Sequence, residues 1–274
     1  MKLIKNAYVT QSGAYYSSGG LVVGSQRIPS NHLMEYWQQA NIETSLALKI
    51  ENNSKIKKVK EALYIGRIPL HFGHFLLEGM PRLCDVCTFK IPIIGFTTKG
   101  LIPKGLIPKG IFTTPIESIN WVIDILKNKK LYQVSEKEIY QVENLFIPEL
   151  PLQLSQSCAE PQRMTPMIKK IVEAARKKNS KISYIENLYL KRSNEKISKR
   201  NKHTISDPSD HISKQIAMVS YAKKLYGNAG SNTHISMFAH QTCRTNFNPR
   251  GDFQQTDRNQ LICDLIKTFN DYKF

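Results

Sequence analysis

The sequence lacks any apolar run long enough to span a bilayer, and its opening stretch, MKLIKNAYVT, lacks the apolar core of a secretory signal peptide. It also lacks a disulfide framework, because its five cysteines are odd in number and irregularly spaced. Unpaired cysteines are typical of a reducing compartment. Together these absences predict a cytoplasmic protein without a membrane span.

Motifs for metal binding are missing as well. Cys84 and Cys87 form a CxxC pair, but no second pair completes a zinc site, so we interpret both thiols as structural. His71 and His74 are three residues apart, whereas the two histidines of the HExxH motif are separated by four. We therefore expect no metal site.

Acidic residues are scarce. The 22 aspartates and glutamates are outnumbered by 39 lysines and arginines, which gives a formal net charge of +17. Such a charge suits nucleic acid, an anionic membrane surface or a phosphorylated substrate, although lysine runs also occur on ordinary solvated faces. No element interleaves aromatic with basic residues, and no nucleic-acid-binding motif is present. We therefore expect no nucleic-acid partner, and we keep a basic nucleic-acid- or polyanion-binding protein as the alternative function.

The chain is long enough for one or two domains, since 41% of its 274 residues are hydrophobic. The first half contains strand-like segments, of which EALYIGRI at 61–68 is the clearest. Short strands alternate with helices from 167 to 271, which is typical of a parallel α/β layer. A Pro- and Ser-containing stretch at about 151–166 predicts a linker between an N-terminal domain of residues 1–150 and a C-terminal domain of residues 167–274.

The first motif is LHFGHFLLEGMPRL, at residues 70–83. On an α-helix His71, His74, Glu78 and Arg82 share one face, because they follow each other at steps of three, four and four. Most of the other residues are apolar. The pattern predicts a helix that is buried on most sides and turns one ionisable edge toward a cleft. The alternative is a helix with an exposed Glu–Arg pair and two capping histidines.

The second motif is DPSDHISKQIAMVSYAKKLYGNAGSNTHISMF, at residues 207–238. We predict a helix capped by Ser209 and Asp210, then a short strand, the glycine turn 227–230 and a second helix that begins near Ser231. Backbone N–H groups and the positive end of a helix dipole suit a phosphate at such a turn. The same arrangement is also an ordinary connection in any α/β domain.

Three pieces in this order resemble glycosyltransferase family 61, including its bacterial capsular polysaccharide enzymes. They are YIGRIPLHFGHFLLEGMPRL, the strand-borne LYLKRS with its basic tail, and the second motif. The family patterns are of the type "NFGHWLLE…PRL", "YISR…R…NE" and "EQI…A…I(V)G…GS/GA", and the resemblance covers about residues 62–240. This chain departs from them in its arginine element, where Arg192 and Arg200 stand close together and Asn194-Glu195 is displaced.

The resemblance implies a GT-B fold, in which two Rossmann-like halves face a central cleft and the C-terminal half holds the nucleotide. It implies an inverting transferase that uses a UDP-sugar as co-substrate, needs no cofactor and requires no bound divalent ion, and the sequence contains no DxD. The implied acceptor is a capsular or lipopolysaccharide saccharide, free or lipid-linked. We expect the net positive charge of the protein to attach it peripherally to the anionic inner face of the plasma membrane. A non-catalytic relative that only binds sugar nucleotides stays open as an alternative.

One-step inversion needs a base for the acceptor hydroxyl and positive groups for the departing diphosphate. We favour Glu78 as the base, with His74 as its rival and His71 nearby on the same face. For the diphosphate we favour Arg192 and Arg200, since a planar guanidinium fits phosphate oxygens well. The further donor- or phosphate-binding candidates are Gly227, Gly230, Ser231, Asn232 and His234. The supporting candidates are Gly73, Arg82 and Gln215, of which Gln215 is expected to brace the glycine turn.

Overall fold

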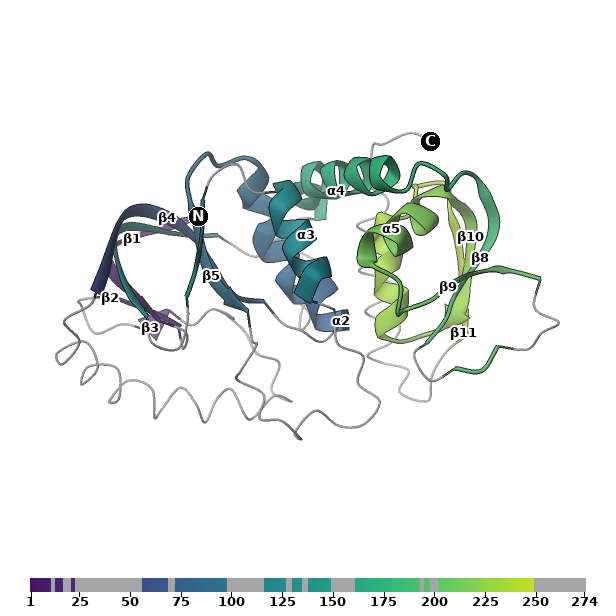
Figure 1. Cartoon of the computed structure of the whole chain (residues 1–274), viewed down its shortest axis with the longest axis horizontal. Coiled ribbons are helices and arrows are strands. Elements are labelled where there is room, and N and C mark those ends of the chain that lie inside the picture. The colour runs from purple at the N-terminus through teal and green to yellow at the C-terminus, as the bar shows by residue number, and fades with distance from the viewer. Residues whose placement is uncertain are drawn as a thin grey trace.

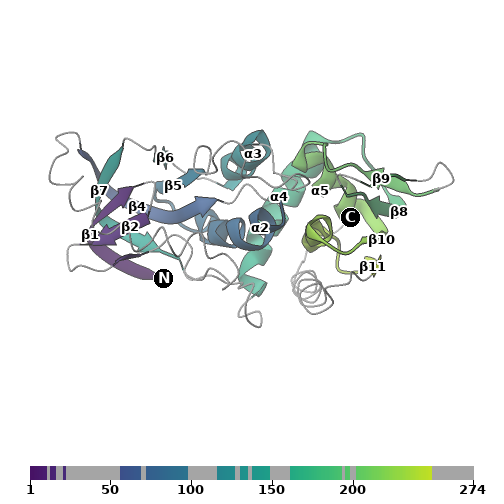
Figure 2. The same cartoon turned by 90° about the horizontal axis from the view of Figure 1, so that it is seen from below.

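The computed structural model describes residues 1–10, 13–16, 21–22, 56–68, 72–97, 116–126, 130–134, 138–148, 161–192, 195–197 and 202–248. In these residues a sheet from the first half of the chain and a sheet from the second half lie on opposite sides of a layer of helices (Figure 1). The view from below shows the same three layers (Figure 2). The described chain is therefore a mixed α/β structure.

The N-terminal sheet has the strand order β3-β2-β1-β7-β4-β5-β6. Strands β4 to β7 pair in parallel, whereas β1 and β2 extend the sheet by antiparallel pairing. The predicted strand at 61–68 is confirmed, and it extends back to Ile56. The strand bounds are β1 Lys2–Thr10, β2 Gly13–Tyr16, β3 Leu21–Val22, β4 Ile56–Ile68, β5 Ile93–Thr97, β6 Leu131–Gln133 and β7 Ile139–Ile147.

Two glycines allow β4 and β5 to approach each other. Gly66 has a φ of 65° at a shift in the β4–β5 register, a conformation that favours glycine. A Cβ on Gly95 would lie 2.4 Å from Ile65 Cγ1 and 2.9 Å from the carbonyl oxygen of Gly66. A side chain at position 95 would push the strands apart, whereas one at position 66 would strain the backbone.

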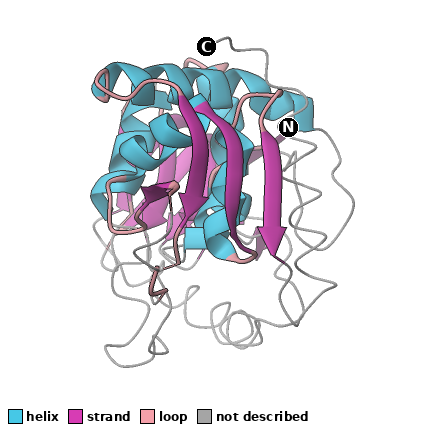
Figure 3. Ribbon diagram, turned by 90° about the vertical axis from the view of Figure 1, so that its right-hand side faces the viewer, coloured by secondary structure: helices cyan, strands magenta, loops and turns pink. Residues whose placement is uncertain are grey.

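The C-terminal sheet has the order β11-β10-β8-β9, and all of its neighbouring strands run parallel (Figure 3). The predicted alternation of short strands and helices in a parallel layer is confirmed as far as residue 248, and its expected continuation to residue 271 lies outside the described residues. The short strand that we expected between the two helices of the second motif is β10, of seven residues. The bounds are β8 Ile185–Leu190, β9 Thr204–Ser206, β10 Ala222–Asn228 and β11 Arg244–Asn248.

One helix, α4, holds the two halves together. It contacts α3 and η2 on the N-terminal side and α5 and η4 on the C-terminal side. Its buried residues belong to one continuous apolar core that also includes residues of both sheets. The helical bounds are α2 Phe72–His74, η1 Phe75–Gly79, η2 Pro81–Cys87, α3 Ile116–Leu126, η3 Pro161–Met164, α4 Thr165–Lys178, α5 Ile212–Tyr221 and η4 Ser231–Phe238.

Polar contacts reinforce this packing. The guanidinium of Arg163 donates to both carboxylate oxygens of Asp85, at 3.1 and 3.2 Å, and ties η3 to η2. Arg176 donates to the hydroxyl and the carbonyl oxygen of Ser220, which ties α4 to α5. Thus the end of the predicted linker, residues 161–166, is helical and packed in the described structure, and the domain boundary itself stays a prediction.

The structure is consistent with a structural role for the CxxC thiols. Neither Cys84 nor Cys87 forms a disulfide bond with another described residue, and burial, followed by the charge of Asp85, raises the pKa of Cys84 to about 12. A thiol with such a pKa stays protonated at neutral pH and is a poor nucleophile. None of the helices in the described ranges has the length and apolar composition that crossing a membrane would require.

Candidate functional site

The first motif forms three short helical pieces in place of the expected single α-helix. The amide of Met80 donates to the carbonyl of Phe75 at 2.8 Å, five residues back, as in a π-turn. Pro81 has no N–H to continue this pattern, and the chain tightens into the 3₁₀ helix η2, where Leu83 donates to Met80. The prediction of one continuous α-helix is therefore wrong, because the number of residues per turn differs along the segment.

Arg82 also departs from the expected edge facing a cleft. Its side chain is only 5% exposed and lies on η2 among buried apolar residues. His71 and its side chain lie outside the described residues. His74 and Glu78 lie on α2 and η1, but their side chains are likewise outside the described part of the structure. The choice between Glu78 and His74 as base stays a prediction.

Gly73 brings the first motif against the second. A Cβ on Gly73 would lie 2.8 Å from Ser231 Oγ, 2.9 Å from Ser231 Cβ and 3.1 Å from His234 Nδ1. Both α2 and η1 contact η4, and His234 is buried, with 7% of its surface exposed. Two segments about 160 residues apart in the sequence thus meet at the beginning of η4.

The glycine turn lies at the carboxyl end of β10, close to the end of β8. A Cβ on Gly227 would lie 3.0 Å from the carbonyl oxygen of Leu190, its register partner. The same oxygen accepts a 2.8 Å hydrogen bond from Asn232 Nδ2, so the Asn232 side chain braces β8. Asn232 Oδ1 is buried and has no hydrogen-bond partner among the described residues. It is an acceptor available to a ligand hydroxyl or N–H group.

The second predicted helix is present as the 3₁₀ helix η4, and hydrogen bonds between its own residues close its first turn. Thr233 donates to the carbonyl of Gly230 through both its backbone N–H, at 3.0 Å, and its hydroxyl, at 2.7 Å. The first amides of a helix have no intrahelical acceptors. At Ser231 and Asn232 these amides therefore offer donors at the edge of the sheet.

Arg192 follows β8 and is held there by a carboxylate that sequence reasoning did not place in the site. Glu195 Oε2 accepts from the backbone N–H of Arg192 at 3.0 Å, and Glu195 Oε1 accepts from Tyr189 and from Asn228. Arg200, the other predicted diphosphate ligand, lies outside the described residues, as does Asn194. The displaced Asn-Glu pair of the arginine element was the sequence signal for Glu195.

A cavity of about 480 Å³ opens beside the glycine turn, at the carboxyl ends of β8, β10 and β11. The sheet register places Tyr226 between Tyr189 and Asn246, so these three share one face. The ring of His203 lies 4.5 Å from that of Tyr226 and 6.3 Å from that of Tyr189. The lining residues are Tyr189, Lys202, His203, Tyr226, Gly227, Asn246 and Asn248. Sequence reasoning missed this cavity, although period-2 alternation on the three strands signals it.

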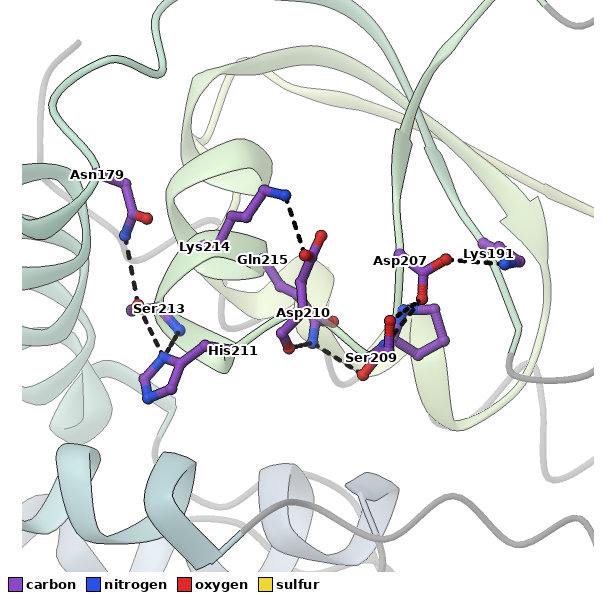
Figure 4. Close-up of polar contacts among 10 residues, drawn as sticks. Asn179, Lys191, Asp207, Ser209, Asp210, His211, Ser213, Lys214 and Gln215 are labelled. Carbon is purple, nitrogen blue, oxygen red and sulfur yellow. Dashed lines mark hydrogen bonds and ion pairs between the residues drawn. The ribbon is translucent and has the colours of Figure 1, made fainter.

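The beginning of α5 also differs from expectation (Figure 4). His211 is the N-cap, because its Nδ1 accepts from the amide of Ser213 at 3.1 Å. Ser209 donates to Asp207, and Asp210 accepts from Lys214, so neither of the two predicted caps performs that role.

Burial, reinforced by the charge of Lys178, lowers the pKa of His211 and favours the neutral ring that can accept this bond. Gln215 donates to the carbonyls of Asp210, at 2.8 Å, and Pro208. It therefore braces the start of α5, not the glycine turn as expected. In the described part of the chain, no group of three or more His, Cys, Asp or Glu side chains is arranged to hold a metal ion.

A family model described as Glycosyltransferase 61 matches residues 72–245. No curated protein matches the chain. The matched range begins one residue before Gly73 and ends within β11. It contains the first motif from Phe72 onward, the second motif and the arginine element, and all of the cavity-lining residues except Asn246 and Asn248.

Proposed function

The chain belongs to the Glycosyltransferase 61 family, and on that premise we propose that it transfers a sugar, with inversion, from a UDP-sugar to a capsular or lipopolysaccharide acceptor. The observation that carries the proposal is the close approach of Gly73 to Ser231 and His234. It joins the segment that bears the candidate bases to the turn suited to phosphate. A transferase needs both at one place, because the acceptor hydroxyl attacks the carbon that bears the diphosphate.

The donor binds at the carboxyl edge of the C-terminal sheet. Ligands of parallel α/β sheets bind beyond the carboxyl ends of the strands, where neighbouring connections diverge. The loop after β8 leads toward β9, and the turn after β10 leads through η4 toward β11 on the other side. The diphosphate lies between Arg192 and the amides of Ser231 and Asn232. The uracil ring of the donor enters the cavity beside Tyr226.

Transfer proceeds in one step. Glu78, or His74 in its place, takes the proton of the acceptor hydroxyl, whose oxygen forms a bond to the anomeric carbon. The bond from that carbon to the donor phosphate breaks, and the nucleoside diphosphate leaves with the electron pair. Arg192 and the η4 amides stabilise the developing charge. We propose that this positive environment takes the place of a divalent ion.

The two sheets correspond in this proposal to the two halves of a GT-B enzyme. The N-terminal half provides the acceptor side and the C-terminal half the donor side. The described core is continuous through α4, which favours coupled movement of the halves over independent rotation.

We propose that the enzyme is cytoplasmic and attaches peripherally to the anionic inner face of the plasma membrane, where lipid-linked acceptors lie. The net charge of +17 and the exposed Lys177 and Lys178 at the end of α4 support this attachment. Sedimentation with anionic and neutral liposomes tests it, since binding that does not depend on lipid charge contradicts it.

The central test is thermal unfolding with UDP or with a DNA oligomer, at low and high salt. Stabilisation by UDP that persists in high salt supports the transferase, because a built site binds by more than net charge. Stabilisation by DNA alone, lost in salt, supports the polyanion-binding alternative. A screen for hydrolysis of nucleotide sugars then identifies the donor, and binding without any turnover supports a non-catalytic relative.

A further inference from the structure

The Glu195 carboxylate joins three pieces of chain at the edge of the C-terminal sheet. One oxygen, Oε2, accepts from the backbone N–H of Arg192 at 3.0 Å. The other, Oε1, accepts from the hydroxyl of Tyr189 and, at 2.7 Å, from Asn228 Nδ2. Tyr189 is on β8, Arg192 lies in the loop after it, and Asn228 is the last residue of β10.

The same network continues to β11. Asn228 Oδ1 accepts from Asn248 Nδ2 at 3.1 Å, and the amide of Ala229 donates to the carbonyl of Asn248 at 2.9 Å. Asn228 and Ala229 belong to the glycine turn that leads into η4. The loop that carries Arg192 and the turn that leads to the η4 amides are therefore fixed to each other through one carboxylate.

The charges in this network are arranged so that Arg192 stays available to a ligand. Glu195 binds the backbone of Arg192, and no hydrogen bond or ion pair of the Arg192 guanidinium is found among the described residues. The neighbouring cation, Lys191, is paired with Asp207 at 2.8 Å. Burial and the bond to Glu195 raise the pKa of Tyr189 to about 12, so its hydroxyl remains a donor at neutral pH.

We propose that Glu195 is a positioning residue, which holds the Arg192 loop and the Asn228–Gly230 turn at the separation that one diphosphate bridges. This inference rests on the proposed function and adds to it a residue that does not itself touch the donor. Preorganised donors bind an anion more tightly than mobile ones, because their ordering is complete before the ligand arrives.

The test measures UDP affinity by calorimetry, and donor KM and kcat, in wild type and in Glu195→Ala and Glu195→Gln. We expect Glu195→Ala to raise the UDP dissociation constant about tenfold or more, through loss of three bonds to a charged acceptor. The KM for the donor should rise more than kcat falls. Glu186→Ala is the matched control, because Glu186 lies on β8, the strand that leads into the Arg192 loop, but at the opposite end of that strand, beside Tyr184, Lys223 and Lys224. Its UDP affinity should equal that of wild type.

A rescue variant separates positioning from general stability. In Glu195→Gln the new amide N–H group can face the N–H group of Asn228, so two donors oppose each other. Asn228→Asp replaces the donor of Asn228 with an acceptor for the new amide at position 195. The double variant Glu195→Gln/Asn228→Asp should therefore bind UDP more tightly than either single variant, by about threefold or more.

The outcomes are distinct. Wild-type UDP affinity in Glu195→Ala, with UDP binding intact in wild type, overturns the role of Glu195 and leaves the proposed function standing. Failure of wild type itself to bind UDP or any other nucleoside diphosphate overturns both. A fall in melting temperature that accounts for the whole loss of affinity, without rescue in the double variant, also overturns the positioning role.

Discussion

The two segments that meet at Gly73 are held in place by different forces. The first motif, on α2, η1 and η2, is fixed mainly by apolar packing, since Phe75, Leu76, Leu77 and Met80 are at most 1% exposed. The edge of the C-terminal sheet is fixed by a hydrogen-bond network around Glu195. Apolar packing fixes a volume, whereas hydrogen bonds fix directions.

This difference suits the two tasks of the proposed transferase. A base needs a constant position beside the acceptor, which a packed segment provides. A diphosphate needs several donors aimed at its oxygens, which a directional network provides. Substitutions in the packed segment should therefore change turnover and stability, and substitutions at the sheet edge should change donor affinity.

The largest effect is expected for Glu78→Gln, in the packed segment. The amide cannot take the acceptor proton, so kcat should fall by about 10²- to 10⁴-fold. UDP affinity should remain within about twofold, because the diphosphate is bound on the other segment. Steady-state kinetics and calorimetry measure the two quantities. Unchanged kcat in this variant together with its loss in His74→Ala would assign the base to His74.

The next effect is expected for Arg192→Ala, at the sheet edge. Loss of a charged donor should weaken UDP binding by about 10- to 100-fold, and Arg192→Lys should recover only part of it. Lys191→Ala is the matched control, since its ammonium group is paired with Asp207. Equal losses in the two alanine variants would indicate that net charge, not the position of Arg192, governs binding.

Gly73→Ala tests the contact between the first motif and the beginning of η4. The added Cβ would lie 2.9 Å from Ser231 Cβ, so the two segments must separate, at a cost of about 1–3 kcal/mol in unfolding free energy. Adding Ser231→Gly removes the clashing atoms and should restore most of the stability. Denaturant unfolding of the two single variants and the double variant gives the coupling. If the changes in unfolding free energy of the two single variants add up to that of the double variant, Gly73 and Ser231 are not in contact in solution.

The smallest effect concerns the pH dependence of stability at the α5 N-cap. The pKa of His211 is lowered from its ordinary value of 6.5, so the unfolded state binds the proton more readily. The contribution of His211 to stability is therefore present above pH 6.5 and is lost as the pH falls through that value toward the folded pKa.

His211→Asn retains a capping side chain and removes the titration. The melting temperature of wild type should drop more than that of His211→Asn between pH 7.5 and pH 5.5. A parallel decline in both proteins would show that other groups determine the acid sensitivity.

Much of the fold was predictable because its signals are local. The parallel layer of the second half followed from short strands that alternate with helices, and β4 ended, as expected, at Ile68. Helix type was less predictable. A π-turn beside a 3₁₀ helix is a response to Pro81 and to the surrounding packing, and it removed the α-helical face on which Arg82 was expected to be exposed.

By itself, the sequence determined the family, the parallel layer and the glycine turn, because each is signalled by residues that are close together along the chain. The tertiary structure alone decided that Gly73 meets Ser231, that Tyr226 lies between Tyr189 and Asn246, and that Glu195 binds three separate pieces of chain. These contacts depend on strand order and on where connections end in space. Residue spacing along the chain contains no such information, since the same local segments can be assembled in more than one order.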